Sequence, residues 1–100
     1  TQKETQMETK AGIPPVIYIS AISNSARTVH YSLTKDFVIS DDALAFDNDC
    51  KFYNNLEQQV SFIEFANKIS ESNKQSKTVK CKMVTKDDNY RVIKEAYILE

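Results

Sequence analysis

Hydrophobic residues change their spacing several times along this chain of 100 residues, and each spacing predicts a different element. Val16 to Ile22 is rich in β-branched residues and almost continuously apolar, which is typical of a central strand covered on both faces. From Arg27 to Thr34, Val29, Tyr31 and Leu33 alternate with polar residues. This period of two predicts a half-buried antiparallel strand.

Turn-forming residues divide the next stretch into short segments. Phe37 to Ser40 is apolar enough for a short strand. Asp41 and Asp42 then turn a hairpin whose return strand is Ala43 to Phe46, with a brief helix over the same residues as the alternative. The polar sequence from Asp47 to Asn54 predicts a loop.

The strongest helical pattern runs from about Leu56 to Glu71. Asn55 can cap it, and Gln58 three residues later fits a capping box. Apolar residues recur at the spacing of one broad helix face, which predicts that this face packs against the sheet. These residues are Leu56, Val60, Phe62, Ile63, Ala66 and Ile69.

The C-terminal part of the chain predicts a β-hairpin. Val79, Cys81 and Met83 alternate with lysines, and Lys86 to Asn89 is a turn-forming sequence. The apolar residues between Tyr90 and Leu99 fit either a helix or a strand. Because the preceding strand needs a partner, the strand is favoured.

Together these elements predict a single α+β domain over residues 13–100, preceded by a disordered polar arm over residues 1–12. The expected sheet is antiparallel and has four to five strands, including a C-terminal β-hairpin. One principal helix (about 56–71) is expected to pack on one face of this sheet. The predicted core consists of Ile17, Ile19, Val29, Tyr31, Leu33, Val38, Leu56, Val60, Ile63, Ala66, Ile69, Val79 and Met83.

Composition narrows the functional classes. The hydrophobic fraction of 41% and the charged fraction of 27% are those of a soluble globular domain. A net charge of −1 argues against a dedicated nucleic-acid binder, which usually carries a basic excess. Gly12 is the only glycine, so glycine-rich phosphate loops are absent. No apolar run approaches the ~20 residues that a membrane-spanning helix needs.

Cys50 and Cys81 are the only cysteines, and they do not form a CxxC pair. With one histidine in the chain they do not suggest a zinc site, so neither a metal nor a cofactor is expected. Two alternatives stay open. A Cys50–Cys81 disulfide would indicate an exported protein, whereas free thiols would indicate a cytoplasmic one.

Catalytic constellations are not evident, so we expect a protein that is not an enzyme. His30 is the single histidine, and it lies on the polar side of its predicted strand without an orienting partner in the sequence. The acidic residues from Asp41 to Asp49 do not fit a calcium loop, because Lys51 and Phe52 occupy positions that need a ligand and a glycine. These acids fit solvated turns.

The remaining signal is a set of tyrosines and lysines. Tyrosine is enriched at recognition surfaces, and Tyr18, Tyr53 and Tyr90 are candidates for such a surface. Lys80, Lys82 and Lys86 have the spacing of one strand face, beside which Tyr90 or Tyr97 could stack on a base.

This set predicts a small non-catalytic protein-binding or accessory module, tethered through its N-terminal arm if exported. The alternatives are a nucleic-acid-associated protein that uses the lysine face, or a small cytosolic inhibitor or immunity-type protein. The expected partner is an unidentified protein, and the sequence does not determine the oligomeric state.

Overall fold

The computed structural model describes residues 14–100, so the predicted arm over residues 1–12 lies outside the described residues. The described elements are β1 (Val16–Ser23), β2 (Thr28–Ser32), β3 (Ala43–Tyr53), β4 (Gln59–Val60), α2 (Phe62–Lys74), β5 (Val79–Lys86) and β6 (Asn89–Ile98). The fold class is α+β, as predicted. None of the helices in residues 14–100 is long and apolar enough to cross a bilayer.

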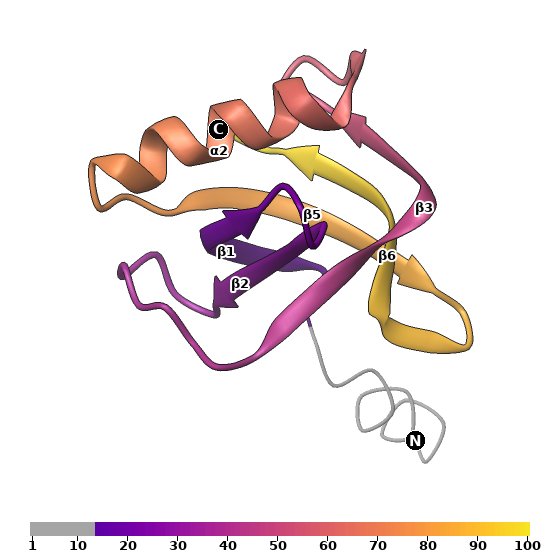
Figure 1. Ribbon diagram of the computed structural model, residues 1–100, viewed down its shortest axis with the longest axis horizontal. Helices are drawn as coiled ribbons and strands as arrows, with labels where there is room; N and C mark the ends of the chain where they lie inside the picture. Colours follow the sequence, from indigo (N-terminus) through magenta and orange to yellow (C-terminus); the bar gives the residue numbers. More distant parts are fainter. Residues whose placement is uncertain (1–13) are drawn as a thin grey trace, which may run out of the picture.

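The sheet closes into a barrel (Figure 1). Its strand order is β2-β1-β5-β6-β3-β4, and an additional pairing of β2 with β3 joins the two sides. β3 and β6 run parallel, whereas the other pairs are antiparallel. The prediction of an antiparallel sheet of four to five strands with one principal helix was therefore correct only in part, because the sheet is mixed and closed. The helix and β5 lie between β3 and β6 in the chain, and a crossover of this length permits parallel pairing.

β3 shows why the middle of the chain was misjudged. The predicted return strand Ala43–Phe46 and the predicted loop after it form one strand of 11 residues. Its register breaks between Phe46, which pairs with Ile93, and Lys51, which pairs with Glu95. The polar residues between them occupy this bulge, so their composition resembles that of a loop although the strand continues. Residues 37–40, predicted as a strand, have no regular structure.

The helix begins at Phe62 rather than near Leu56. Ser61 caps it, and the Ser61 Oγ accepts a hydrogen bond of 3.1 Å from the Glu64 backbone N–H. The expected cap region instead forms a turn in which Asn54 Oδ1 accepts from the backbone N–H groups of Leu56 and Gln58. This turn returns the chain to β4, which pairs with the end of β3.

The buried side of the helix keeps Ala66 and Ile69 from the predicted face but includes Phe65 in place of Ile63. Phe65, Ala66 and Ile69 face the interior, whereas Ile63 is 65% exposed. The helix packs against β1, β3 and β5 (Figure 1). Phe65 stacks at a tilt on Phe52, with ring centroids 4.9 Å apart. The helix is thus anchored to the barrel by an aromatic contact.

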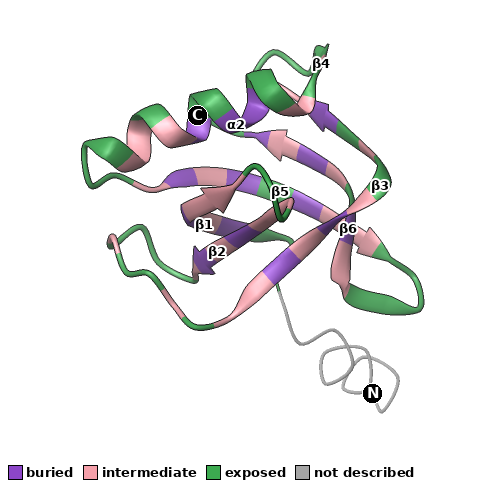
Figure 2. Ribbon diagram, in the orientation of Figure 1, coloured by how far each residue is buried: buried purple, intermediate pink, exposed green. Residues whose placement is uncertain are grey.

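The barrel interior contains most of the predicted core (Figure 2). The confirmed members are Ile17, Ile19, Val29, Tyr31, Ala66, Ile69, Val79 and Met83. Val60 is only partly buried. Four predictions were wrong, because Leu33 and Val38 lie in the loop between β2 and β3, Leu56 lies in the turn before β4, and Ile63 is on the outer side of the helix.

The C-terminal hairpin is confirmed. β5 and β6 pair in antiparallel fashion from Cys81 with Ile98 to Lys86 with Asn89, which leaves a tight turn of Asp87 and Asp88. Both residues suit the backbone of a tight hairpin turn.

Candidate interaction surface

Three side chains predicted to be functional lie in one row across the outside of the barrel. Tyr53 on β3 pairs in register with Tyr97 on β6, which pairs with Lys82 on β5. The two tyrosine rings are stacked, with centroids 4.5 Å apart and planes 9° from parallel. The Lys82 Nζ lies 5.7 Å from the centre of the Tyr97 ring. The row is therefore already assembled before any partner binds.

The neighbouring row extends this surface. Tyr18 on β1 pairs with Lys80 on β5. Because Lys80 and Lys82 are two positions apart on one strand, their side chains leave the same face of the sheet. We call Tyr18, Tyr53, Tyr97, Lys80 and Lys82 together the tyrosine–lysine face.

Tyr90 and Lys86 lie apart from this face. Tyr90 is exposed near the start of β6, where the Arg91 guanidinium carbon lies 5.9 Å from its ring centre. The Lys86 Nζ lies 3.6 Å from a carboxylate oxygen of Asp47 on β3. The β5–β6 register shifts on both sides of Thr85, so the alternation that links Lys80 and Lys82 does not continue to Lys86.

Carboxylates lie among the lysines of the tyrosine–lysine face. The Tyr97 hydroxyl donates a 2.9 Å hydrogen bond to Glu95 Oε1, and this bond raises the pKa of Tyr97. The negative charge of Glu57 acts in the same direction. The electrostatic character of the face is mixed rather than basic.

A groove begins beside Tyr97, where β3 and β6 separate. Their pairing ends at Tyr53 and Tyr97, after which Asn54 starts the turn toward β4 while β6 continues to Ile98. Two cavities follow, of about 350 and about 230 Å³, and they share Asn54, Asn55 and Ile98. We call the two cavities together the groove.

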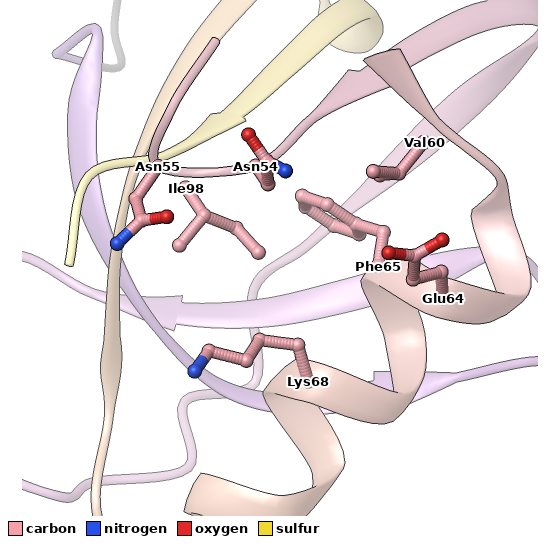
Figure 3. A pocket seen from close by; sticks show the side chains of 7 residues that line it. All are labelled: Asn54, Asn55, Val60, Glu64, Phe65, Lys68 and Ile98. Atoms are coloured by element: carbon pink, nitrogen blue, oxygen red, sulfur yellow. The ribbon is translucent and has the colours of Figure 1, made fainter. Parts of the chain in front are cut away.

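The two cavities of the groove have similar chemistry. The larger cavity is also lined by Glu57, Lys82, Tyr97 and Leu99. The smaller cavity lies between the helix and the end of β6, with Lys68 and Glu64 beside Val60 and Phe65 (Figure 3). Each end thus combines apolar surface with one lysine and one glutamate.

The cysteines do not form the disulfide that was left open as an alternative. Both thiols are free. Cys81 faces the barrel interior, where burial raises the pKa of its thiol. Burial also raises the pKa of Cys50 from 9.0 to about 12, and the opposing effect of Arg27 is smaller. Both thiols are therefore protonated at neutral pH and poorly nucleophilic.

The histidine and the possible metal ligands do not form a site in the described residues. His30 Nδ1 lies 2.8 Å from the Ser40 carbonyl oxygen, so this nitrogen donates to the backbone. Within residues 14–100, no group of three or more His, Cys, Asp or Glu side chains is arranged to hold a metal ion.

Sequence reasoning missed the groove. Asn54 and Asn55 were assigned to a loop and a helix cap, and Lys68 and Ile98 to no site. No local pattern links these residues, because they come from the end of β3, the middle of the helix and the end of β6.

Comparisons with protein-family models, with curated proteins and with solved structures find no match to this chain. The geometry of the tyrosine–lysine face and of the groove is therefore the basis on which a function is proposed.

Proposed function

We propose that this chain is a small non-catalytic module that binds a partner protein on the tyrosine–lysine face. The observation that carries the proposal is the stacked pair of Tyr53 and Tyr97 in register with Lys82, directly beside a groove. Tyrosine offers a large apolar area with a polar tip, which is why it is enriched at protein interfaces.

Preorganisation supports this use of the face. The two rings already pack against each other, and the Tyr97 hydroxyl is held by Glu95. Side chains that are fixed before binding lose less conformational entropy in a complex, so more of the contact energy appears as affinity.

The charges favour a protein over a polyanion. Lys82 lines the larger cavity together with Glu57, and Glu95 bonds the Tyr97 hydroxyl beside it, so a phosphate backbone would meet carboxylates as well as an ammonium group. A protein surface with both signs of charge can complement this arrangement.

The test begins with capture of partners by the tagged chain and identification by mass spectrometry. Affinities are then measured for Tyr53→Ala and Tyr97→Ala. If these tyrosines are anchors, each substitution should weaken binding about 30-fold or more, as expected for a hot spot. Tyr90→Ala is the matched control, because Tyr90 is an exposed tyrosine of the same strand outside the face. Equal affinity in all variants would refute the proposal.

Single-stranded nucleic acid is the second candidate. A closed barrel of five long strands, with the helix between β3 and β5, is similar in architecture to the OB-fold, whose members bind oligonucleotides and oligosaccharides. A fold by itself does not determine function, so this argument is one of analogy. The specific observation in its favour is Lys82 beside the Tyr97 ring, a pairing suited to a phosphate next to a stacked base.

An anisotropy titration with a labelled oligothymidine separates the two candidates. Nucleic-acid binding should be strongest at low salt and should weaken steeply as salt is added. Lys82→Gln should reduce both the affinity and the salt dependence. Absence of binding at low salt excludes this second candidate without affecting the first.

A further inference from the structure

Two opposite charges line the larger cavity of the groove without neutralising each other. Lys82 comes from β5 and Glu57 from the turn before β4. Within residues 14–100, the ion pairs of the chain include neither of these side chains. The neighbouring carboxylate of Glu95 accepts a hydrogen bond from the Tyr97 hydroxyl and does not line this cavity. An ammonium group and a carboxylate in one cavity fit a ligand that carries both charges itself.

The smaller cavity differs from the larger one in how its charges are placed and in size. Its Glu64 and Lys68 are four positions apart on the helix, so they are neighbours on one helix surface and can partly neutralise each other. Its volume of about 230 Å³ is below the ~300–1,000 Å³ of typical small-molecule sites, whereas the larger cavity, at about 350 Å³, lies within that range. The larger cavity is therefore the better site for a small charged ligand.

The turn that carries Glu57 is fixed by hydrogen bonds. Glu57 has a φ of 62°, in the left-handed region that few residues other than glycine adopt. Its backbone N–H donates a 3.0 Å hydrogen bond to the Asn54 carbonyl oxygen. The Asn54 side-chain oxygen accepts from the backbone N–H groups of Leu56 and Gln58 at 2.9 and 3.0 Å. Strained backbone held in this way is common at ligand sites, and here it keeps Glu57 at the edge of the cavity.

The lysine and the apolar wall of the larger cavity are also held in place. The Lys82 Nζ lies 5.7 Å from the centre of the Tyr97 ring. Ile98 and Leu99 supply the apolar wall, and the Leu99 backbone N–H donates a 2.9 Å hydrogen bond to the Lys80 carbonyl oxygen. Leu99 is 43% exposed, so an apolar group of a ligand can pack on it.

We propose that the larger cavity binds a free α-amino acid with an apolar side chain. The carboxylate of the ligand pairs with Lys82, its ammonium group pairs with Glu57, and its side chain packs on Leu99. A zwitterion satisfies both protein charges at once, whereas a simple anion or cation satisfies one of them and is repelled by the other. This inference goes beyond the proposed function, because the ligand is a small molecule rather than a partner protein.

Titration of the isotopically labelled full chain with L-leucine at neutral pH, followed by NMR, tests the proposal. The backbone amide signals of residues 54–57 and 97–99 should shift and saturate with a Kd of about 1 mM or lower. Leucinamide lacks the carboxylate, and N-acetylleucine lacks the ammonium group. Each should bind about fivefold or more weakly than leucine, because each leaves one protein charge without a partner.

Two substitutions assign the charges. Lys82→Gln should abolish the preference for leucine over leucinamide, and Glu57→Gln should abolish the preference for leucine over N-acetylleucine. Both positions are exposed, so the fold should persist. Lys68→Gln and Glu64→Gln are the matched controls, because they remove the same charges from the smaller cavity and should leave the Kd unchanged.

Three outcomes would overturn the proposal. The first is the absence of saturable shifts up to about 20 mM leucine. The second is equal affinity for leucine, leucinamide and N-acetylleucine. The third is an equal loss of affinity in the control variants, which would indicate a general charge effect. The titration contains no partner protein, so its failure is distinct from a failure of partner binding.

Discussion

The two outer sides of the barrel share one interior but present different chemistry. Where the second half of β1 pairs with β2, and β2 with the start of β3, the outward positions are Ala21, Ser23, Thr28, Ala43 and Ala45, together with His30. We call this set the small-residue face. Over the start of β1, β5, β6 and the end of β3, the corresponding positions carry the tyrosines and lysines of the tyrosine–lysine face.

This difference indicates which side could supply more binding energy to a partner. Small side chains offer little area to bury, and the His30 ring is already bonded to the Ser40 carbonyl. Stacked tyrosines offer large rigid area beside a groove. Since a few large anchors supply most of the energy of an interface, the tyrosine–lysine face is the better candidate.

The interior supports both faces, so a change there should have the largest effect. Phe65→Ala removes a fully buried ring that contacts Phe52 and should lower the free energy of unfolding by about 3–5 kcal/mol. Ile63→Ala, on the exposed side of the same helix, should change it by less than about 0.5 kcal/mol. Urea denaturation measures both. Equal losses would show that the helix face is wrongly assigned.

Charge reversal on the two faces tests the comparison directly. Lys82→Glu should weaken partner binding about tenfold or more, because Lys82 lies over the Tyr97 ring and lines the groove. Thr28→Glu on the small-residue face should leave the affinity unchanged. Titration calorimetry with the captured partner gives both values. A larger loss for Thr28→Glu would reverse the assignment of the binding face.

A polar contact links the interior residue Tyr31 on β2 to Asp42 at the end of the loop before β3. The Tyr31 hydroxyl donates a 2.6 Å hydrogen bond to Asp42 Oδ2, and the Asp42 carboxylate also pairs with Arg91. Tyr31→Phe should lower stability by about 1 kcal/mol, because Asp42 keeps its second partner. Thermal and urea unfolding provide the measurement. Partner binding should be unaffected, and a loss of affinity would mean that the two faces are coupled.

The bulge in β3 lies between the two faces, and Cys50 within it predicts a loss of stability at alkaline pH. Cys50 has a folded pKa of about 12 against an ordinary value of 9.0, so the unfolded chain releases its proton first as the pH rises. The contribution of the Cys50 thiol to the free energy of unfolding should therefore be complete below pH 9 and be lost between pH 9 and about 12. Cys50→Ser should reduce this decline in urea titrations at several pH values. An unchanged decline would assign it to Cys81 or to other groups.

Sequence patterns succeeded where one local period governs the structure. The alternation of Val79, Cys81 and Met83 predicted β5, and the apolar run from Val16 predicted β1. They failed where two local signals compete. Asn55 with Gln58 and Ser61 with Glu64 both resemble helix starts, and only the pairing of β4 with β3 decides for the second.

The candidate surface was predictable only in part. The alternation of apolar and polar residues in β5 predicted that Lys80 and Lys82 lie on the same face of the sheet. The stack of Tyr53 on Tyr97 depends on the parallel pairing of β3 with β6, which no local pattern specifies. The groove requires the separation of these strands and the position of the helix, so its residues carry no shared signal in the sequence.

The sequence by itself determined the class of the domain, about half of its interior residues and the hairpin at its C-terminus, because burial periodicity is local. Tertiary structure decided the closure of the barrel, the parallel pair, the buried side of the helix and the free state of the thiols. Those features depend on which distant segments meet. Their free energies come from contacts between segments, such as Phe65 with Phe52, rather than from the preference of any single segment.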